Sequence, residues 1–290
     1  MSARINKRGR GCITAIALLV ILAVAAIVFI YDQNNRMVVD ELSVHLENLP
    51  KGFEGFRIAH VSDLHGKEYG KNNKNLIEKI KESKPDMIAI TGDIIEDEEQ
   101  LPKVEEFLKG IADIAPVYYV TGNHEWSSGT VQDVKRILAE TGGKIFQNTY
   151  ETLKSGGSEI ILAGVDDPNG PADQKTLREL TREIRSKKPN AFILLLAHRN
   201  ENIGEYARNG INLALAGHAH GGVIRLPYTD GLIDTQRNLF PSYTSGAYQL
   251  DDTWMVVSRG LGNGKSVPTR LFNHPQLLII SLERELADES

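Results

Sequence analysis

Residues 57–65 read Arg-Ile-Ala-His-Val-Ser-Asp-Leu-His, a short apolar run that ends in two metal-ligand residues. The run from Arg57 to Val61 has the length and apolar content of a strand inside a sheet. Asp63 and His65 follow it and, because they are two residues apart, they point the same way in an extended segment. The stretch therefore predicts a strand followed at once by two ligands for one site.

Four other apolar runs end in the same manner. Their ends read Thr91-Gly-Asp93, Thr121-Gly-Asn123-His124-Glu125, Ala197-His198 and Ala216-Gly-His218-Ala-His220. Groups that follow the carboxyl ends of neighbouring strands in an α/β sheet converge in one crevice. Carboxylate, amide and imidazole ligands together suit divalent metals, and one carboxylate can bridge two ions about 3.5 to 4 Å apart. The pattern predicts a two-metal site.

The rest of the chain alternates apolar runs with amphipathic stretches. We expect strands at 38–46, 57–61, 87–90, 117–120, 159–163, 192–197 and 213–216, and helices at 73–82, 101–110, 130–140, 174–187 and 202–208. Beyond Gly221 we expect only short strands, at 223–226, 254–257 and 277–280. Such alternation predicts an α/β domain whose sheet lies between helices.

The N-terminal part of the chain has the composition of a membrane anchor. Residues 12–31 carry no charge, and as a helix they would span about 30 Å, the thickness of the hydrocarbon core. Basic residues precede this run, so the positive-inside rule places the N-terminus in the cytoplasm. We therefore expect a basic cytoplasmic tail at 1–11, a single transmembrane helix at 12–31, a linker at 32–37 and a domain at 38–285 outside the cell membrane.

A cleaved signal peptide is the alternative, because Ala23-Val-Ala25 has the small-x-small pattern of a cleavage site. That tripeptide lies within the apolar run, and cleavage there would leave a strongly apolar new terminus from Ile27 to Ile30. The sequence therefore favours an uncleaved anchor.

Composition excludes several other classes of protein. The only cysteine, Cys12, rules out an intramolecular disulfide framework and a cysteine-based zinc site. The net charge is −5 although basic residues precede the span, so the domain does not have the basic surface that nucleic-acid binding requires. We expect no nucleic-acid partner, and the sequence does not determine the oligomeric state.

In this order the motifs Asp-x-His, Gly-Asp-x-x-Glu (92–96), Gly-Asn-His-Glu (122–125), a lone His198 and Gly-His-x-His (217–220) resemble those of the calcineurin-like metallophosphoesterases. The apolar N-terminus and the tail from Val257 to Gly262 resemble the membrane-anchored bacterial branch typified by YkuE and YaeI. The resemblance implies an α/β fold of the four-layer αββα sandwich type and the hydrolysis of phosphoester or pyrophosphate bonds.

The resemblance also implies a role for each motif residue. Asp63, His65 and His220 would bind one metal ion, Asn123, His198 and His218 the second, and Asp93 would bridge the two. A water or hydroxide shared by the ions would attack phosphorus, and His124 would act as the acid toward the leaving oxygen. The two divalent ions could be Mn, Fe, Zn or Co, because such ligand sets accept each of them.

Some residues near these motifs have a simpler interpretation. We expect Glu125 and Glu96 to orient ligands rather than bind metal, and Asp166 and Asp167 to form a turn before Pro168. His45, His60 and His274 are expected outside the metal site, with His60 close enough to brace it. Candidates for lining the substrate pocket are Trp126, Tyr228, Arg199 and Arg259.

Departures from the family pattern limit the choice of substrate. The segment after Asp93 reads Ile-Ile-Glu-Asp and lacks the Asp-Arg pair of protein serine/threonine phosphatases, and Arg199-Asn200 replaces the Asn-Pro that follows the lone histidine in this branch. We expect a small-molecule or lipid-linked phosphate of the cell envelope. A UDP-2,3-diacylglucosamine-type pyrophosphate hydrolase and a non-catalytic membrane scaffold stay open as alternatives, and an acidic domain argues against a nuclease.

Overall fold

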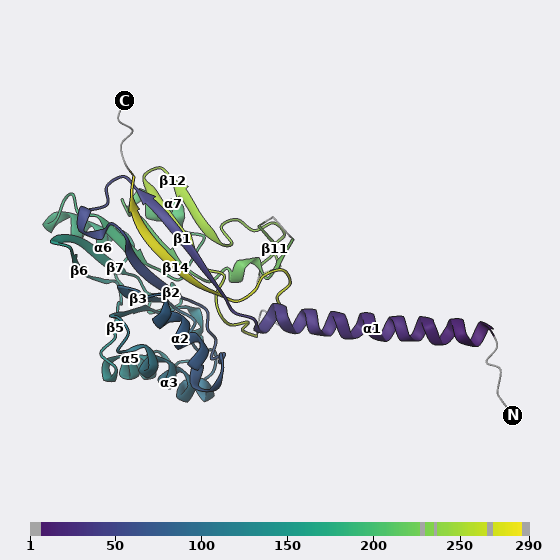
Figure 1. Ribbon diagram of the computed structural model, residues 1–290. Coiled ribbons are helices and arrows are strands. Elements are labelled where there is room, and N and C mark those ends of the chain that lie inside the picture. Colours follow the sequence, from purple (N-terminus) through teal and green to yellow (C-terminus); the bar gives the residue numbers. More distant parts are fainter. Residues whose placement is uncertain (1–6, 227–229, 235–236, 266–268, 286–290) are drawn as a thin grey trace.

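The structure, a computed structural model, describes residues 7–226, 230–234, 237–265 and 269–285. Helix α1 (Lys7–Asn35) projects from one side of an α/β domain (Figure 1). Its segment Gly11–Asn35 is long and apolar enough to cross a membrane, and its apolar side chains are exposed. The helix continues four residues beyond Tyr31, so much of the segment expected as a linker is helical.

The first of two six-stranded sheets starts with the strand that follows α1. Its strands, in spatial order, are β1 (Val38–Leu46), β14 (Gln276–Arg284), β2 (Phe56–Val61), β3 (Met87–Thr91), β4 (Val117–Val120) and β5 (Lys144–Ile145). Strands β2 to β5 are parallel, and β14 joins the two ends of the domain by pairing parallel with β1 and antiparallel with β2.

The second sheet contains the strands of the later half of the chain. Its order is β12 (Gly246–Leu250), β13 (Thr253–Val257), β9 (Leu213–Ala216), β8 (Ile193–Leu196), β7 (Ser158–Gly164) and β6 (Thr149–Ser155). The four central strands are parallel, while the edge strands β12 and β6 are antiparallel to their neighbours.

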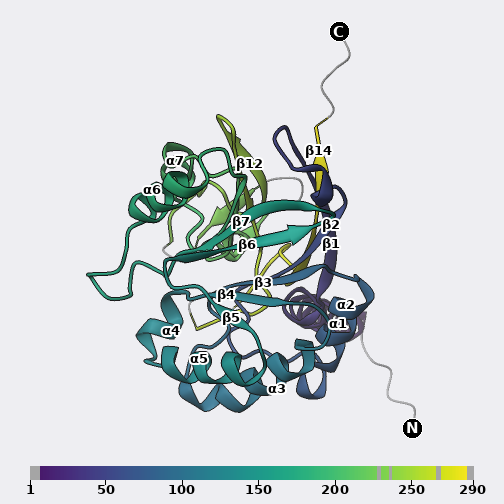
Figure 2. The ribbon, with the colours of Figure 1, turned by 90° about the vertical axis from the view of Figure 1, so that its left-hand side faces the viewer.

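Helices cover the outer face of each sheet, as Figure 2 shows for α3 and α5 below the first sheet and for α6 and α7 on the other side. The first sheet packs against α2 (Lys74–Glu82), α3 (Leu101–Ile111) and α5 (Val131–Glu140), and the second against α6 (Leu177–Lys187) and α7 (Ile203–Arg208). The expected α/β fold with sheets flanked by helices is confirmed, and it has the four expected layers.

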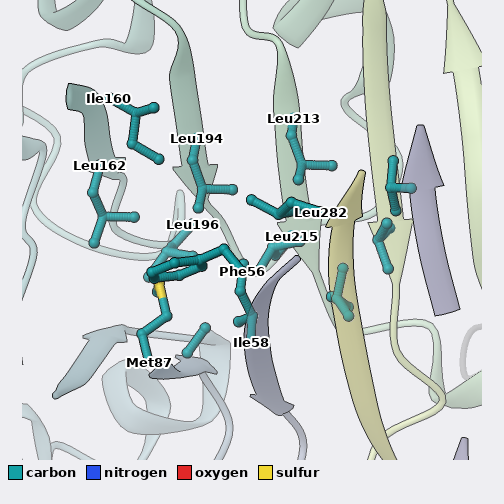
Figure 3. Close-up of a cluster of buried hydrophobic side chains, with 14 of the residues drawn as sticks. Phe56, Ile58, Met87, Ile160, Leu162, Leu194, Leu196, Leu213, Leu215 and Leu282 are labelled. Atoms are coloured by element: carbon teal, nitrogen blue, oxygen red, sulfur yellow. The ribbon is translucent and has the colours of Figure 1, made fainter. Parts of the chain in front are cut away.

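The inner faces of the two sheets form a shared core (Figure 3). Ile58 of β2 and Leu194 of β8 point into this layer, whereas Ala59, the next residue after Ile58, faces the helices. Strands β3, β4, β8 and β9 are thus buried on both faces, and this burial explains why they are continuous apolar runs in the sequence.

The remaining described elements are short. They are the helix α4 (Asn123–Ser127), the paired strands β10 (Ile224–Arg225) and β11 (Gly231–Ile233), and 3₁₀ turns at Lys51–Phe53, Lys71–Asn73, Glu98–Gln100 and His220–Gly222. The sequence analysis did not predict α4, β5, β6, β11 or β12. Strands β6 and β12 were missed because both are edge strands whose polar residues face solvent on one side. The other expected strands and helices occur within a few residues of their predicted bounds.

Candidate metal centre

Five strand ends converge at one edge of the two sheets. Asp63 and His65 follow β2, and Asp93 follows β3. Asn123 and His124 begin α4 just after β4, whereas His198 follows β8, and His218 and His220 follow β9. Three strands of the first sheet and two of the second therefore contribute to the same site, which lies across the junction of the sheets.

Left-handed backbone turns bring several of these side chains together. The φ angles are 51° at Asp63, 49° at His65, 51° at Asp93, 66° at His218 and 47° at His220. Residues other than glycine rarely adopt such angles, and they persist only where the surrounding structure enforces them. Their concentration at these strand ends supports the functional site predicted there. The left-handed angles themselves were not predicted, and Asp63 and His65 do not form the extended segment that the sequence had suggested.

The side chains form three overlapping groups of potential metal ligands. The groups are Asp63 with His65 and His220, His65 with Asp93 and His124, and Asp93 with His198 and His218, and the ligand atoms within each group lie within 4.8 Å of one another. The Asn123 side-chain oxygen lies 3.2 Å from His198 Nε2. The structure thus brings together all seven expected ligands and His124.

Asp93 lies between the two halves of the cluster. Its Oδ2 atom is 3.2 Å from His198 Nε2 and 3.9 Å from His65 Nε2. On one side of this pair, His220 Nε2 lies 3.6 Å from an oxygen of Asp63. A single buried carboxylate is therefore close to ligands of both proposed ions, as a bridging ligand must be.

Burial keeps most of the imidazoles neutral. It lowers the pKa of His65 to about 3 and of His218 to about 2, and it lowers the pKa of His220 well below its usual range. Neutral rings retain a lone pair for a metal ion. In addition, Nδ1 of His65 is buried without a hydrogen-bond partner among the described residues. These observations and the mixed donor set fit divalent cations.

The carboxylates are strongly affected by burial and by one histidine. Burial raises the pKa of Asp63 to about 6. Although burial opposes the charge of His198, the neighbouring Asp93 carboxylate raises the pKa of this histidine to about 10. Burial likewise opposes the charge of Asp93, yet His198 holds the pKa of that carboxyl well below its usual range. Two anions in a buried site need positive charge, which metal ions would supply.

Glu125 holds the turns that carry Asp93 and Asn123. One oxygen of its buried carboxylate accepts backbone N–H bonds from Asp93 (2.9 Å) and Gly122 (2.7 Å), and the other accepts from Ile94 (2.9 Å) and Ile95 (3.4 Å). Burial, together with the charge of Asp93, raises the pKa of Glu125 to about 7. As expected, this glutamate orients the ligands.

A second brace acts on His198. The backbone oxygen of Thr91 lies 2.7 Å from His198 Nδ1 and fixes the ring with Nε2 toward Asp93. His60 Nε2 lies 2.8 Å from the Thr91 hydroxyl, so His60 supports the ligand through this threonine. Glu96 has one oxygen 3.9 Å from His124 Nδ1 and stands beside the expected acid.

Asp167 binds Arg199, a role that the sequence did not indicate. The Arg199 side chain donates Nε to one Asp167 oxygen (2.6 Å) and Nη2 to the other (3.1 Å), while Nη1 lies 2.9 Å from His218 Nε2. Asp167 also accepts from the backbone N–H of Asn169 in the turn expected here. A fixed guanidinium thus lies at the edge of the cluster, beside a pocket of ≈ 310 Å³ that includes His198.

Arg270 is a residue of the site that sequence reasoning missed. Its side chain is fully buried, with Nη2 lying 3.2 Å from His220 Nδ1 and donating to Gly262 O (2.6 Å). Asn273 donates to the backbone oxygen of His220 (2.7 Å). The segment before β14 therefore clamps the loop that carries His218 and His220. A lone arginine in a polar loop has no periodicity that could have revealed this contact.

The other residues expected to line the substrate pocket do not lie together. Trp126 donates its indole N–H to Thr121 (2.9 Å) beside the site, while Arg259 pairs with Asp40 (2.9 Å). Asp166 accepts from the Thr121 hydroxyl (2.8 Å) rather than joining the ligand groups. Tyr228 lies outside the described residues.

Comparisons with known proteins agree with this site. A family model described as calcineurin-like phosphoesterase matches residues 56–222, more than half of the chain. The uncharacterized metallophosphoesterase YkuE of Bacillus subtilis is 29% identical over 261 residues, which cover 87% of this chain and 88% of YkuE. The transmembrane protein with metallophosphoesterase domain of Danio rerio is 24% identical over 283 residues, covering 92% of this chain and 62% of that protein.

Among solved structures, that of TT1561 from Thermus thermophilus aligns with this chain at a TM-score of 0.49 and 12% identity. The alignment covers 72% of this chain and 91% of the TT1561 chain.

Proposed function

Because this chain belongs to the calcineurin-like phosphoesterases, and is therefore a metallophosphoesterase, we propose that it is a membrane-anchored enzyme with a two-metal site. Asp63, His65 and His220 bind one ion in this proposal, and Asn123, His198 and His218 bind the other. Asp93 bridges them. The observation that carries the assignment is the overlap of the ligand groups at Asp93, which is within reach of both halves of the cluster.

Two divalent ions, when bound, would activate a water molecule and neutralise the charge of the phosphoryl group. The protein orients the substrate with Arg199, whose guanidinium is held rigid by Asp167 at the edge of the cluster. Guanidinium groups bind phosphoryl oxygens through two parallel N–H donors. Because Asp167 binds Nε and one N–H of Nη2, and Nη1 lies against His218, the second N–H groups of Nη1 and Nη2 would make this contact. We assign Arg199 to this contact, which would hold the phosphate in line for attack.

His124 is the proposed acid for the leaving oxygen. Its backbone N–H donates to Asp93 (2.8 Å), and its ring meets His65 edge-on with centroids 4.8 Å apart. About a fifth of its side chain is exposed (22%), more than for His65 (2%), so it lies at the mouth of the cluster where a leaving group would depart. Glu96, with one oxygen 3.9 Å from Nδ1, can orient the ring.

The proposed substrate is a phosphoester or pyrophosphate of the cell envelope, either small or lipid-linked. Supporting this, α1 has the length and composition of a membrane anchor and leads directly into β1. The protein would cross the cell membrane once. The basic residues before the apolar run favour a cytoplasmic N-terminus and a catalytic domain on the outer side of that membrane.

The test uses the full-length protein in detergent with p-nitrophenyl phosphate and bis-p-nitrophenyl phosphate, after loading with Mn or Zn or treatment with a chelator. We expect turnover that requires metal and disappears in Asp93→Asn. The ratio of the two rates distinguishes a monoesterase from a diesterase. A folded protein that contains two metals per chain and hydrolyses neither compound would contradict the general phosphoesterase and favour a scaffold.

A further inference from the structure

The carboxyl end of α1 is fixed to the catalytic domain rather than joined to it by a flexible linker. The ring of Phe29 lies against Phe272, with centroids 5.4 Å apart. The side-chain oxygen of Asn34 accepts from Asn263 Nδ2 (2.6 Å) and from the backbone N–H of Arg270 (2.7 Å). Lys67 donates its ammonium to the backbone oxygen of Asn34. The last turns of the helix therefore have a defined position relative to the site.

A pocket of ≈ 780 Å³ lies between this end of α1 and the domain. Ile27, Ile30 and Tyr31 of α1 form one wall, and the facing wall includes Lys67 and Lys265. Tyr31 marks the end of the uncharged run, and Ile27 lies about 6 Å deeper along the helix axis. One wall of the pocket thus continues into the apolar surface of the anchor.

The same pocket reaches the metal centre. His65, a member of two of the ligand groups, belongs to its lining, as does Glu96, which stands 3.9 Å from His124. A molecule in this pocket would therefore contact the apolar face of α1 at one end and the candidate catalytic groups at the other. A water-soluble phosphate would not need the first contact.

Resting on the proposed function, we propose that this pocket binds the first methylene groups of an alkyl or acyl chain, so that the substrate is a phosphoester embedded in the outer leaflet. Its phosphoryl group would lie at the metal centre while its chain follows Ile30 and Ile27 into the bilayer. Such a lipid could enter from the membrane without transfer of its chain through water, a transfer that opposes reaction for long chains.

The pocket is lined by two lysines and two carboxylates, and the lysine nearest α1 is the one without a carboxylate partner among the described residues. Lys67 donates to oxygens of Asn34 and Asn263, and its ammonium also lies over the Tyr69 ring, 5.3 Å from the centroid. Burial lowers the pKa of Lys67 to about 8, and among the described residues no carboxylate pairs with it. Lys265 is paired with Asp97 (2.7 Å), and Glu96 adds a second carboxylate at the inner end. The basic group therefore lies near Asn34, at the depth where lipid headgroups meet the anchor.

The test compares esters that differ only in chain length, using full-length protein in lipid nanodiscs. Dodecyl and methyl phosphates are supplied as monoesters and as p-nitrophenyl diesters, so that either kind of esterase is assayed. Two buried methylenes correspond to about a tenfold preference in kcat/KM for the dodecyl compounds. We expect Ile30→Trp, which fills the pocket, to remove most of that preference while methyl ester turnover stays within about twofold of wild type.

Val28→Trp is the matched control. Val28 is exposed, does not line the pocket, and is turned about 160° from Ile30 around the helix. We expect its rates to equal those of the wild type for both chain lengths. Equal preference in the wild type and in both tryptophan variants, or equal turnover of methyl and dodecyl esters, would overturn the lipid pocket while leaving the phosphoesterase intact.

A readout that does not depend on turnover separates the two proposals. A dodecylphosphonate that carries a photoreactive diazirine along its chain should form adducts on α1 residues 27–31, and Ile30→Trp should abolish them. Adducts confined to other parts of α1 would contradict the pocket whatever the enzyme activity. Loss of turnover for every ester together with adducts at 27–31 would instead contradict the proposed function alone.

Discussion

Replacing Glu125 by glutamine tests whether this carboxylate positions the metal ligands. Each oxygen of Glu125 accepts two backbone N–H groups, one pair from Asp93 and Gly122 and the other from Ile94 and Ile95. A glutamine amide has one oxygen, so either orientation of its side chain leaves two buried N–H groups facing an NH₂ group. The substitution changes almost no volume and removes only the acceptor.

The expected loss follows from the two unpaired donors. Each buried donor without a partner costs about 1–3 kcal/mol, so Glu125→Gln should destabilise the domain by about 2–6 kcal/mol. For a domain of this size the loss corresponds to a fall in Tm of roughly 4–24 °C. Since burial raises the pKa of Glu125 to about 7, the measurement belongs at pH 8, where the carboxylate predominates.

The assay is thermal unfolding of full-length protein in detergent, followed by tryptophan fluorescence, together with metal content per chain. Glu179→Gln is the control, because Glu179 is an exposed residue of the capping box of α6 and glutamine serves equally well there. We expect the control to change stability by less than about 0.5 kcal/mol. A Glu125→Gln protein with the Tm and the metal content of the control would refute this reasoning.

Three further substitutions test other parts of the structure. Burial lowers the pKa of His60 to about 3, so the folded protein keeps this histidine neutral, and the resulting stability is lost as the pH falls below 6.5. In urea unfolding, the free energy by which wild type exceeds His60→Gln should therefore shrink by about 1.4 kcal/mol between pH 7.5 and 5.5. A difference that stays constant over this pH range would contradict the prediction. A Cβ at Gly122 would lie 2.2 Å from Asp93 Oδ1, so Gly122→Ala should destabilise the fold by about 1–3 kcal/mol and lower the metal content per chain, measured by mass spectrometry. An unchanged metal content would show that Asp93 can move away from the added methyl group. Asn34→Ala should weaken the docking of α1 by about 1–3 kcal/mol and speed hydrogen exchange in residues 29–35. Asn35→Ala is the control, because the Asn35 side chain bonds only within α1, and it should leave the exchange rates unchanged. Equal exchange rates in the two variants would show that other residues dock the helix.

Arg270 connects α1 to the candidate metal centre. Its backbone N–H binds Asn34 of α1, and its guanidinium lies against His220. The position of α1 and that of a candidate ligand therefore depend on the same residue. This contact gives a physical reason why α1 and the domain form one structure and not two parts joined by a flexible linker.

The sequence alone predicted the layered α/β fold and identified the candidate ligands. Strands buried on both faces must be continuous apolar runs, and the ligands stand directly after those runs, so both features are local and can be recognised without coordinates. The apolar run at 12–31 was equally plain, because crossing a membrane requires length and a lack of charge.

Only the tertiary structure decided which distant residues support the site. The sequence indicated that Glu125 orients ligands but not that it binds the Asp93 turn. Its bonds to that turn, the Asp167–Arg199 pair and the contact of Arg270 with His220 join segments far apart in the chain, and none leaves a periodic pattern. The edge strands β6 and β12 were missed for a related reason, since a strand with one solvated face owes its place to its neighbour in the sheet. The pocket beside α1 likewise exists only because Asn34 is bound by residues more than 200 positions later in the chain. Tertiary packing, not spacing in the sequence, brings those residues next to Asn34.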